Sequence, residues 1–305
     1  MIWTDVQPSK RAELLQRRDA GELVEDLAAE IGMRPSTLSR RLRGLSAKMN
    51  PKPQKIGRPK SEYKWNKPPV FKGNATVTGD LHMPYLDYDL AENLLRASEI
   101  ILPEPRRLII AGDLFNMDAF SPFPPTNVRR ATFKEEVASA KNFLNAARNV
   151  FDTVEVLVGN HERRLIYITR GELSSSDLGL VVNVDDVNFH VYSWGILETE
   201  SGPWRITHQK NYSRNAQSVG VKLAHKYRQH IITHHQHRIS KGYDDSGKSV
   251  VIDNGCLADP EKLDYVNLVD STTPVMNRGF TIVRNGSGTL FGKGDEFTDW
   301  DLLLS

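Results

Sequence analysis

The sequence predicts an α/β fold built on two β-sheets, preceded by a small all-α domain. Strand-like apolar runs alternate with helix-like segments from residue 71 to residue 172, which is the βαβ order of a mostly parallel sheet. Beyond residue 187 the strand-like runs are shorter and more closely spaced, which indicates a second sheet packed on the first. Before residue 46 the apolar residues recur at helical spacing. We therefore expect three parts, residues 1–46, 47–70 and 71–305.

The length and composition favour a protein with a large core and no membrane segment. The 305 residues suffice for two domains. No apolar run of about 18 residues or more occurs, so we expect no transmembrane helix, and no secretory signal is visible at the N-terminus. The single cysteine, Cys256, has no partner for an internal disulfide. This favours a packed thiol and a reducing cytoplasm.

The charge is distributed unevenly along the chain. Residues 1–70 contain 15 basic and 8 acidic residues, whereas the remaining residues contain 25 basic and 30 acidic ones. A basic arm on an acidic body is typical of a segment that binds a polyanion. A solvated surface would carry the same modest excess, so the charge alone leaves both interpretations open.

Three short helices are predicted in the N-terminal arm, over residues 9–20, 23–31 and 36–45. The second ends at Gly32, as a C-terminal glycine would end it, and Pro35 suits the first turn of the third. The third helix has an apolar face, and its polar face carries three arginines, Arg40, Arg41 and Arg43.

Two short helices joined at a glycine, the second rich in arginine, resemble the helix-turn-helix of DNA-binding proteins over residues 10–46. Ala28 has the small side chain that this motif needs where its helices cross. Arg34 departs from the motif, which usually has Ser or Thr as the helix cap. The resemblance implies DNA contacts by Arg40, Arg41 and Arg43. A three-helix bundle that binds protein is the alternative.

Residues 47–70 are predicted to form a basic linker rich in proline and lysine. Within it, Gly57-Arg58-Pro59 resembles the core of AT-hook peptides, whose thin extended backbone lets an arginine reach the floor of the minor groove. That resemblance implies a DNA contact by Arg58. A solvated tether explains the same prolines and lysines.

The body is predicted to continue with alternating elements. The first strands are expected at 74–79, 107–112 and 153–158, with helices at 89–98, 127–150 and 162–172. The later strands are expected at 187–197, 204–207, 231–233, 250–252 and 280–283, with one helix at 216–228. The tail, 297–305, combines acids with Trp300 and three leucines, which suits docking on the body or on a partner.

Polar side chains follow the predicted strands where each strand ends. After the first three strands these are Asp80, His82, Asp113, Asn116, Asn160, His161 and Glu162, and after the later ones His208, His234, His235 and His237. In α/β sheets, ligand-binding sites lie at the carboxyl ends of the strands, so we expect these side chains to lie close together. Carboxylate, imidazole and amide groups bind Mn²⁺, Fe²⁺ or Zn²⁺. Their number suits two ions that share a bridging carboxylate.

These motifs, in this order, resemble the five motifs of the calcineurin-like metallophosphoesterases over residues 73–290. The resemblance implies an αββα sandwich and two divalent ions, for which Mn²⁺ is the first candidate. It implies that Asp80, His82 and His237 hold one ion, and that Asn160, His208 and His235 hold the other. Asp113 would bridge the ions. His161 would hydrogen-bond the substrate or protonate the leaving oxygen.

Two positions depart from the family pattern. Asn116 stands where many members have Asp, and we expect it to support the ligands rather than bind an ion. His234 replaces the glycine that usually begins the last motif, so the ligand is His234 or His235. The spacing to His237 favours His235.

We do not expect the remaining polar residues near these motifs to bind a metal ion. Arg163 and Arg164 are candidates for stabilising charge on the phosphoryl oxygens, or they are a solvated helix start. Surface or capping positions are expected for Asp87, Asp89, Asp118, Asp185 and Asp186. Packing or surface positions are expected for His190, His225 and His230.

The predicted function is hydrolysis of phosphodiesters by a hydroxide that bridges two metal ions. The N-terminal arm favours DNA as partner and substrate, hence a DNA nuclease or end-processing enzyme. The order of the body also resembles compact phosphoesterases of phages and prophages, some described as repair exonucleases, and this resemblance implies the cytoplasm of a bacterium or of a phage-infected host. The alternatives are a phosphatase on a nucleotide or phosphoprotein, and a DNA-binding regulator that uses the fold as a scaffold. The sequence is compatible with a monomer or a homo-oligomer.

Overall fold

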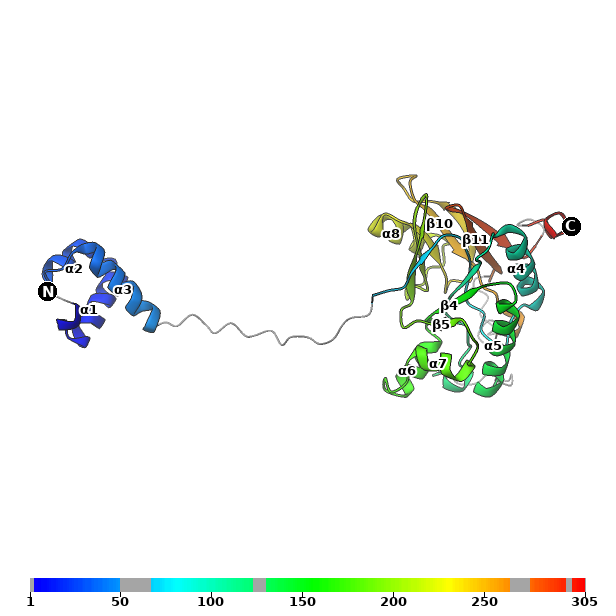
Figure 1. Ribbon diagram of the computed structural model, residues 1–305, viewed down its shortest axis with the longest axis horizontal. Helices are drawn as coiled ribbons and strands as arrows, with labels where there is room; N and C mark the ends of the chain where they lie inside the picture. The colour runs from blue at the N-terminus through cyan, green and yellow to red at the C-terminus, as the bar shows by residue number, and fades with distance from the viewer. Residues whose placement is uncertain (1–2, 50–66, 123–129, 264–274, 295–297, 305) are drawn as a thin grey trace. The chain divides into compact units, whose positions relative to one another are not determined.

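The computed structural model of the chain describes residues 3–49, 67–122, 130–263, 275–294 and 298–304. The chain divides into two compact units, Met1–Trp65 and Asn66–Ser305, each of which is described by itself (Figure 1). Arg58 and the AT-hook-like segment lie outside the described residues. Within the described ranges, none of the helices has the length and hydrophobicity that a bilayer crossing requires.

The N-terminal unit contains the three predicted helices. After a single 3₁₀ turn at Trp3–Asp5, these are α1 (Pro8–Asp19), α2 (Val24–Glu30) and α3 (Pro35–Met49). Gly32 lies between α2 and α3 with φ +60°, a backbone conformation in which glycine is not strained. The helices enclose a small core of buried side chains, Val6, Leu14, Leu15, Leu27, Ala28, Ile31, Leu38 and Leu42. Ala28 is fully buried, so its small side chain permits the close packing.

The charges of this unit are segregated. Arg17 on α1 hydrogen-bonds Glu22 at 2.5 Å and Glu30 at 2.8 Å, and Lys10 pairs with Glu30 at 2.6 Å. On α3 the exposed side chains of Arg40, Arg41 and Arg43 have no carboxylate partner among the described residues. The positive charge of α3 is therefore uncompensated, whereas that of α1 is largely neutralised.

The body contains two six-stranded sheets, which confirms the predicted sandwich. The first sheet has the order β12 (Ser287–Gly292), β11 (Gly279–Arg284), β2 (Ala75–Thr78), β3 (Arg107–Ala111), β4 (Thr153–Leu157), β5 (Val187–Phe189). The second has the order β1 (Val70–Lys72), β6 (Trp194–Thr199), β7 (Gly202–Thr207), β8 (His230–Thr233), β10 (Val250–Asn254), β9 (Ile239–Tyr243). Strands β2 to β5 pair in parallel, as do β7, β8 and β10.

Helices cover the outer faces of the two sheets. They are α4 (Tyr88–Ile101), α5 (Phe133–Arg148), α6 (Glu162–Ile168), α7 (Ser175–Val182), α8 (Ser218–Tyr227) and α9 (Trp300–Leu304). In Figure 1, α4 and α5 lie on one side of the sandwich and α8 on the other. Along β3 the side chains alternate between layers: Leu108 and Ile110 pack with α4 and α5, whereas Ile109 and Ala111 meet Trp204 of the second sheet.

Two predicted elements of the body are wrong in extent. The run 187–197 forms two strands, β5 in the first sheet and β6 in the second, because the chain crosses between the sheets from His190 to Ser193. The helix expected at 162–172 ends at Ile168, before Gly171 with φ +85°, and α7 follows as a separate helix.

The start of α5 and the C-terminal tail show how local side chains set element boundaries. The helix predicted from residue 127 begins at Phe133, where Thr132 and Glu135 form a reciprocal capping box; residues 123–129 lie outside the described part. In the tail, Trp300 packs on Phe280 and Phe291, so the described tail docks on the body.

Candidate metal centre

The seven ligand-type residues converge at the carboxyl ends of strands from both sheets. Asp80, His82, Asp113 and Asn160 follow β2, β3 and β4 of the first sheet, and His208, His235 and His237 follow β7 and β8 of the second. Three overlapping groups have ligand atoms within 4.8 Å of one another: Asp80, His82, His237; His82, Asp113, His161; and Asp113, His208, His235. Both sheets are therefore needed to assemble the centre.

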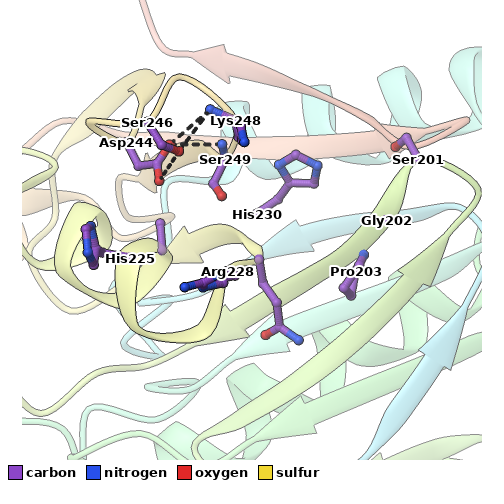
Figure 2. Close-up of a pocket in the computed structure, with 12 residues that line it drawn as sticks. Ser201, Gly202, Pro203, His225, Arg228, His230, Asp244, Ser246, Lys248 and Ser249 are labelled. Carbon is purple, nitrogen blue, oxygen red and sulfur yellow. Dashed lines mark hydrogen bonds between the residues drawn. The ribbon is translucent and has the colours of Figure 1, made fainter.

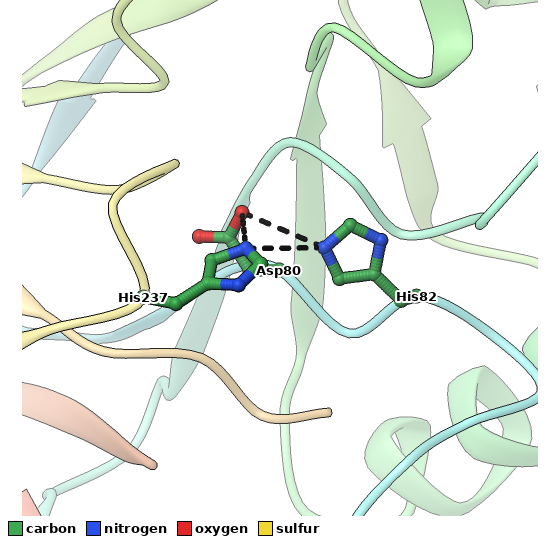
Figure 3. A group of neighbouring side chains, drawn as sticks. All are labelled: Asp80, His82 and His237. Atoms are coloured by element: carbon green, nitrogen blue, oxygen red, sulfur yellow. Dashed lines mark hydrogen bonds and ion pairs between the residues drawn. The ribbon is translucent and has the colours of Figure 1, made fainter. Parts of the chain in front are cut away.

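The first group is Asp80, His82 and His237 (Figure 3). His237 Nε2 lies 3.0 Å from Asp80 Oδ1 and 3.2 Å from His82 Nε2. His82 Nδ1 donates to Asn116 Oδ1 at 3.0 Å, and His237 Nδ1 faces the Met276 sulfur at 3.2 Å. Because His82 carries its proton on Nδ1, its Nε2 is an acceptor, as is the Asp80 oxygen, and one proton on His237 Nε2 can satisfy only one of the two. The group has more acceptors than protons, so these residues fit a divalent ion.

The second group is Asp113, His208 and His235, with Asn160 beside it. His208 Nδ1 donates to the Ala111 carbonyl at 3.0 Å, which leaves its Nε2 as an acceptor. That Nε2 lies 2.8 Å from Asn160 Oδ1 and 3.4 Å from Asp113 Oδ2. Acceptors again converge, so this group also fits a cation.

Asp113 lies between the two groups. Its Oδ2 is 3.4 Å from His208 Nε2 and 4.0 Å from His82 Nε2, and its Oδ1 accepts the His161 backbone N–H at 2.9 Å. Burial and the carboxylates of Glu162 and Asp80 raise the pKa of Asp113 well above its usual value. Positive charge is therefore required to keep Asp113 ionised, which suits a ligand that bridges two ions.

His234 lies apart from the ligands. Its Nε2 accepts from Asn254 Nδ2 at 2.9 Å, and its ring packs against Gly79, where an added Cβ would approach the ring to 2.5 Å. Of the two neighbouring histidines, His235 is the one that the structure brings to Asp113 and His208.

His161 and Arg164 form a pair beside the ligands. His161 Nδ1 donates to the Asn116 carbonyl at 2.6 Å, and its Nε2 accepts from Arg164 Nη2 at 3.0 Å. Burial, His82 and Arg164 lower the pKa of His161 well below its usual value. Arg164 also donates to the Asn116 carbonyl, whereas Arg163 is exposed. A neutral imidazole and a guanidinium therefore lie together at the centre.

Glycines and one carboxylate position the loops that carry these residues. Glu162 accepts backbone N–H groups of Asp113 at 3.1 Å, Phe115 at 3.1 Å and Gly159 at 2.7 Å, and so ties the loops after β3 and β4 together. A Cβ at Gly159 would lie 2.0 Å from Asp113 Oδ1, so only glycine fits there. Sequence reasoning placed Glu162 in the motif without this bridging role.

The backbone of the ligand loops is strained. Five ligand-type residues adopt positive φ, namely Asp80 at 53°, His82 at 47°, Asp113 at 49°, His235 at 78° and His237 at 53°. For residues with a Cβ this conformation costs about 1 kcal/mol or more each. Strain of this kind is typical of side chains that are held for binding or catalysis.

Asp118 supports the centre, and the expectation that it is a surface or capping acid is wrong. Only 6% of Asp118 is exposed. Its Oδ1 accepts from Asn116 Nδ2 at 2.7 Å, and its Oδ2 accepts from the Tyr85 hydroxyl at 2.6 Å. Since Asn116 Oδ1 in turn accepts from His82 Nδ1, Asp118 orients His82 through Asn116. Asp118 thus places a carboxylate near the ligands two residues after position 116, where this chain has Asn instead of Asp. This role of Asp118 is visible only in the folded structure.

Replacing Asp118 with alanine should weaken metal binding and lower catalytic activity by about 10- to 100-fold, because residues that orient metal ligands have effects of this size. Metal affinity is measured by titration of the stripped protein. Asp89→Ala is the matched control, since the Asp89 side chain is 90% exposed and should leave both quantities unchanged. Equal effects of the two substitutions would contradict the role of Asp118.

Glu136 introduces a pH dependence of stability close to the centre. Its carboxylate accepts the backbone N–H groups of Met117 at 2.7 Å and Asp118 at 2.8 Å. Burial raises the pKa of Glu136 to about 8, with a further contribution from the Asp118 and Glu162 carboxylates. The folded protein therefore prefers the protonated form.

The free energy of unfolding should fall as the pH rises from about 4.5 to about 8. Below the ordinary pKa of 4.5 Glu136 is protonated in both states and its contribution is fully present; above it the unfolded chain loses the proton first. The loss should approach roughly 5 kcal/mol at most. Urea unfolding at several pH values measures it, and Glu136→Gln should flatten the profile. A variant with the unchanged slope would show that other groups cause the dependence.

Comparisons with known proteins cover most of the body. The family model described as calcineurin-like phosphoesterase matches residues 74–269, a range that includes all seven ligand-type residues. No curated protein sequence matches the chain.

Similar solved structures are distant in sequence. A hypothetical protein from Pyrococcus horikoshii has 9% identity and a TM-score of 0.44, covering 77% of this chain and 96% of that one. Vps29 from Chaetomium thermophilum has 12% identity and a TM-score of 0.39, covering 74% and 92%. Wild-type Vps29 from Entamoeba histolytica, complexed with Zn²⁺, has 13% identity and a TM-score of 0.39, covering 72% and 91%.

Proposed function

Because this chain belongs to the calcineurin-like phosphoesterase family, we propose that it is a metal-dependent phosphodiesterase that acts on DNA, as a nuclease or end-processing enzyme. The observation that carries the proposal is the convergence of ligand-type side chains from both sheets in three overlapping groups, two of which contain Asp113. A DNA substrate is supported by the uncompensated arginines of α3.

Two divalent ions, Mn²⁺ in the first place, would polarise the phosphoryl group and lower the pKa of a water. One ion would be held by Asp80, His82 and His237, the other by Asn160, His208 and His235, with Asp113 shared. The donor set of imidazole, carboxylate and amide suits Mn²⁺, Fe²⁺ or Zn²⁺.

The side chains of His161 and Arg164 would act on the substrate itself. The guanidinium of Arg164, already beside the His161 Nε2, would donate to a phosphoryl oxygen and stabilise the charge that develops there. The bond from His161 Nδ1 to the Asn116 carbonyl holds the ring in place, so that Nε2 faces the substrate. Once its Nε2 has taken up a proton from solvent, His161 would hydrogen-bond the substrate or pass that proton to the leaving oxygen. Arg163, which is exposed, would contact a neighbouring phosphate.

The N-terminal unit would deliver the enzyme to DNA. Its compact three-helix core and the arginine-rich third helix support a helix-turn-helix, in which α3 contacts phosphates and base edges. The proposal includes a reducing cytoplasm as the location, in keeping with a fully buried Cys256 thiol.

A hydrolysis assay of the purified full-length chain tests the proposal. With Mn²⁺, the protein should cleave single-stranded or double-stranded DNA, and EDTA or Asp80→Ala should abolish cleavage. Intact DNA together with hydrolysis of a small aryl phosphodiester would keep the reaction class but exclude the DNA substrate. Binding of DNA without any hydrolysis, unchanged in Asp80→Ala, would favour a regulator that uses the fold as a scaffold.

A further inference from the structure

A cavity of about 390 Å³ lies at the amino ends of β8 and β10, whereas the candidate metal centre lies beyond their carboxyl ends. Figure 2 shows the loop from Asp244 to Ser249 above the end of α8 that carries His225 and Arg228. The four residues of β8 separate the cavity from the metal-ligand loop by about 13 Å. A ligand bound in the cavity would therefore not be the group that is hydrolysed.

The uncompensated charge of the cavity is positive. Arg228 and Lys248 line it, are exposed, and have no carboxylate partner among the described residues. Asp244, the carboxylate in the lining, is engaged by its own loop: it accepts from the Ser246 hydroxyl at 2.9 Å and from the backbone N–H groups of Lys248 at 3.2 Å and Ser249 at 3.0 Å. Two cations thus remain available to an anion.

Arg228 occupies a position at which glycine would be the ordinary residue. It caps the C-terminal end of α8 with φ 54° and ψ 47°, and its backbone N–H bonds the Ala224 carbonyl. Helices commonly end on a left-handed glycine because a side chain there is strained. The chain carries an arginine in this strained conformation, and this arginine lines the cavity. This is the pattern of a side chain retained for binding.

His230 also lines the cavity, and its Nδ1 already accepts the Val250 N–H at 3.0 Å. The size of the cavity falls in the range of small-ligand sites.

We propose that this cavity binds the phosphate group of a nucleotide or phosphorylated sugar through Arg228 and Lys248. Two positively charged side chains that lack a carboxylate partner among the described residues suit the charge and the oxygen acceptors of a phosphate group. The same chemistry is present in the backbone of a nucleic-acid strand, so the source of the phosphate is decided by experiment.

Binding of adenosine monophosphate to the full-length protein in EDTA tests the proposal by calorimetry. Adenosine monophosphate should bind, and adenosine, which lacks the phosphate, should bind at least about tenfold more weakly. Arg228→Gly and Lys248→Gln should each weaken binding by about tenfold or more. Lys222→Gln, on the same helix but outside the cavity, should leave it unchanged. Since glycine suits the backbone at position 228, Arg228→Gly should melt no lower than the parent protein.

The same binding experiment is then repeated with a short DNA oligonucleotide. If the oligonucleotide binds about tenfold more weakly to Arg228→Gly and Lys248→Gln while the mononucleotide does not bind, the cavity takes its phosphate from a nucleic-acid strand. If neither probe binds, or if both bind the two variants as tightly as Lys222→Gln, the proposal is overturned.

Discussion

Replacing Asp113 with asparagine should lower the rate of phosphodiester hydrolysis by about 10³-fold or more. Asp113 is the carboxylate within reach of both ligand groups, with Oδ2 3.4 Å from His208 Nε2 and 4.0 Å from His82 Nε2. A two-ion clamp supplies several kcal/mol of transition-state stabilisation, and each 1.4 kcal/mol corresponds to about tenfold in rate. The rate is measured with an aryl phosphodiester, and the metal content of the same sample by elemental analysis.

Loss of activity must be separated from loss of the fold. The amide oxygen of Asp113→Asn can still accept the His161 N–H, so the variant should melt in EDTA at about the temperature of the parent protein. Added Mn²⁺ should stabilise the parent protein but not the variant. Asp185→Ala, an exposed acid, is the control for the charge change. A variant that keeps two ions and full activity would contradict the bridging role.

Replacing Arg40, Arg41 and Arg43 with alanine should weaken DNA binding by about 100-fold or more. These exposed guanidinium groups have no acidic partner among the described residues, so they are available to phosphates, whereas Arg17 is held by Glu22 and Glu30. Each phosphate contact that is lost should also reduce the slope of log affinity against log salt by about one. Affinity is measured at several salt concentrations by fluorescence anisotropy.

The controls for this variant address both the fold and the chemistry. Arg18→Ala on α1 removes an arginine that already pairs with Asp19, and should leave the salt slope unchanged. Hydrolysis of a small aryl phosphodiester should be unaffected by the triple substitution, because the α3 arginines lie in the other unit. An unchanged affinity for DNA would exclude α3 as the DNA-binding helix and favour a protein-binding bundle.

The sequence predicted the layers of the fold because buried parallel strands leave strong local signals. The runs that became β2, β3 and β4 are apolar, end at glycine and are followed by polar groups. The same signal wrongly predicted a single strand at 187–197, where the run contributes one strand to each sheet. Short edge strands such as β1 and β9 were not predicted, since three to five residues with one buried face are not distinguishable from loops by pattern.

The ligand-type residues could be assembled from their motifs, but their supporting contacts could not. The bond from Asp118 to Asn116 and the three backbone bonds to Glu162 depend on how the loops after β2, β3 and β4 turn. The cavity at Arg228 and Lys248 was likewise unpredicted, because it is formed by a helix end and a hairpin loop that only the fold brings together.

The left-handed backbone of the five ligand-type residues has a consequence for the lifetime of the protein in a cell. Strain of about 1 kcal/mol or more at each position is offset in part by a metal ion that engages the side chains. Without their ions, the loops that bear Asp80, Asp113 and His235 should open locally and become the first points of attack for proteases. The abundance of the protein would then follow the supply of the divalent metal, so that a starved cell degrades the copies it cannot load.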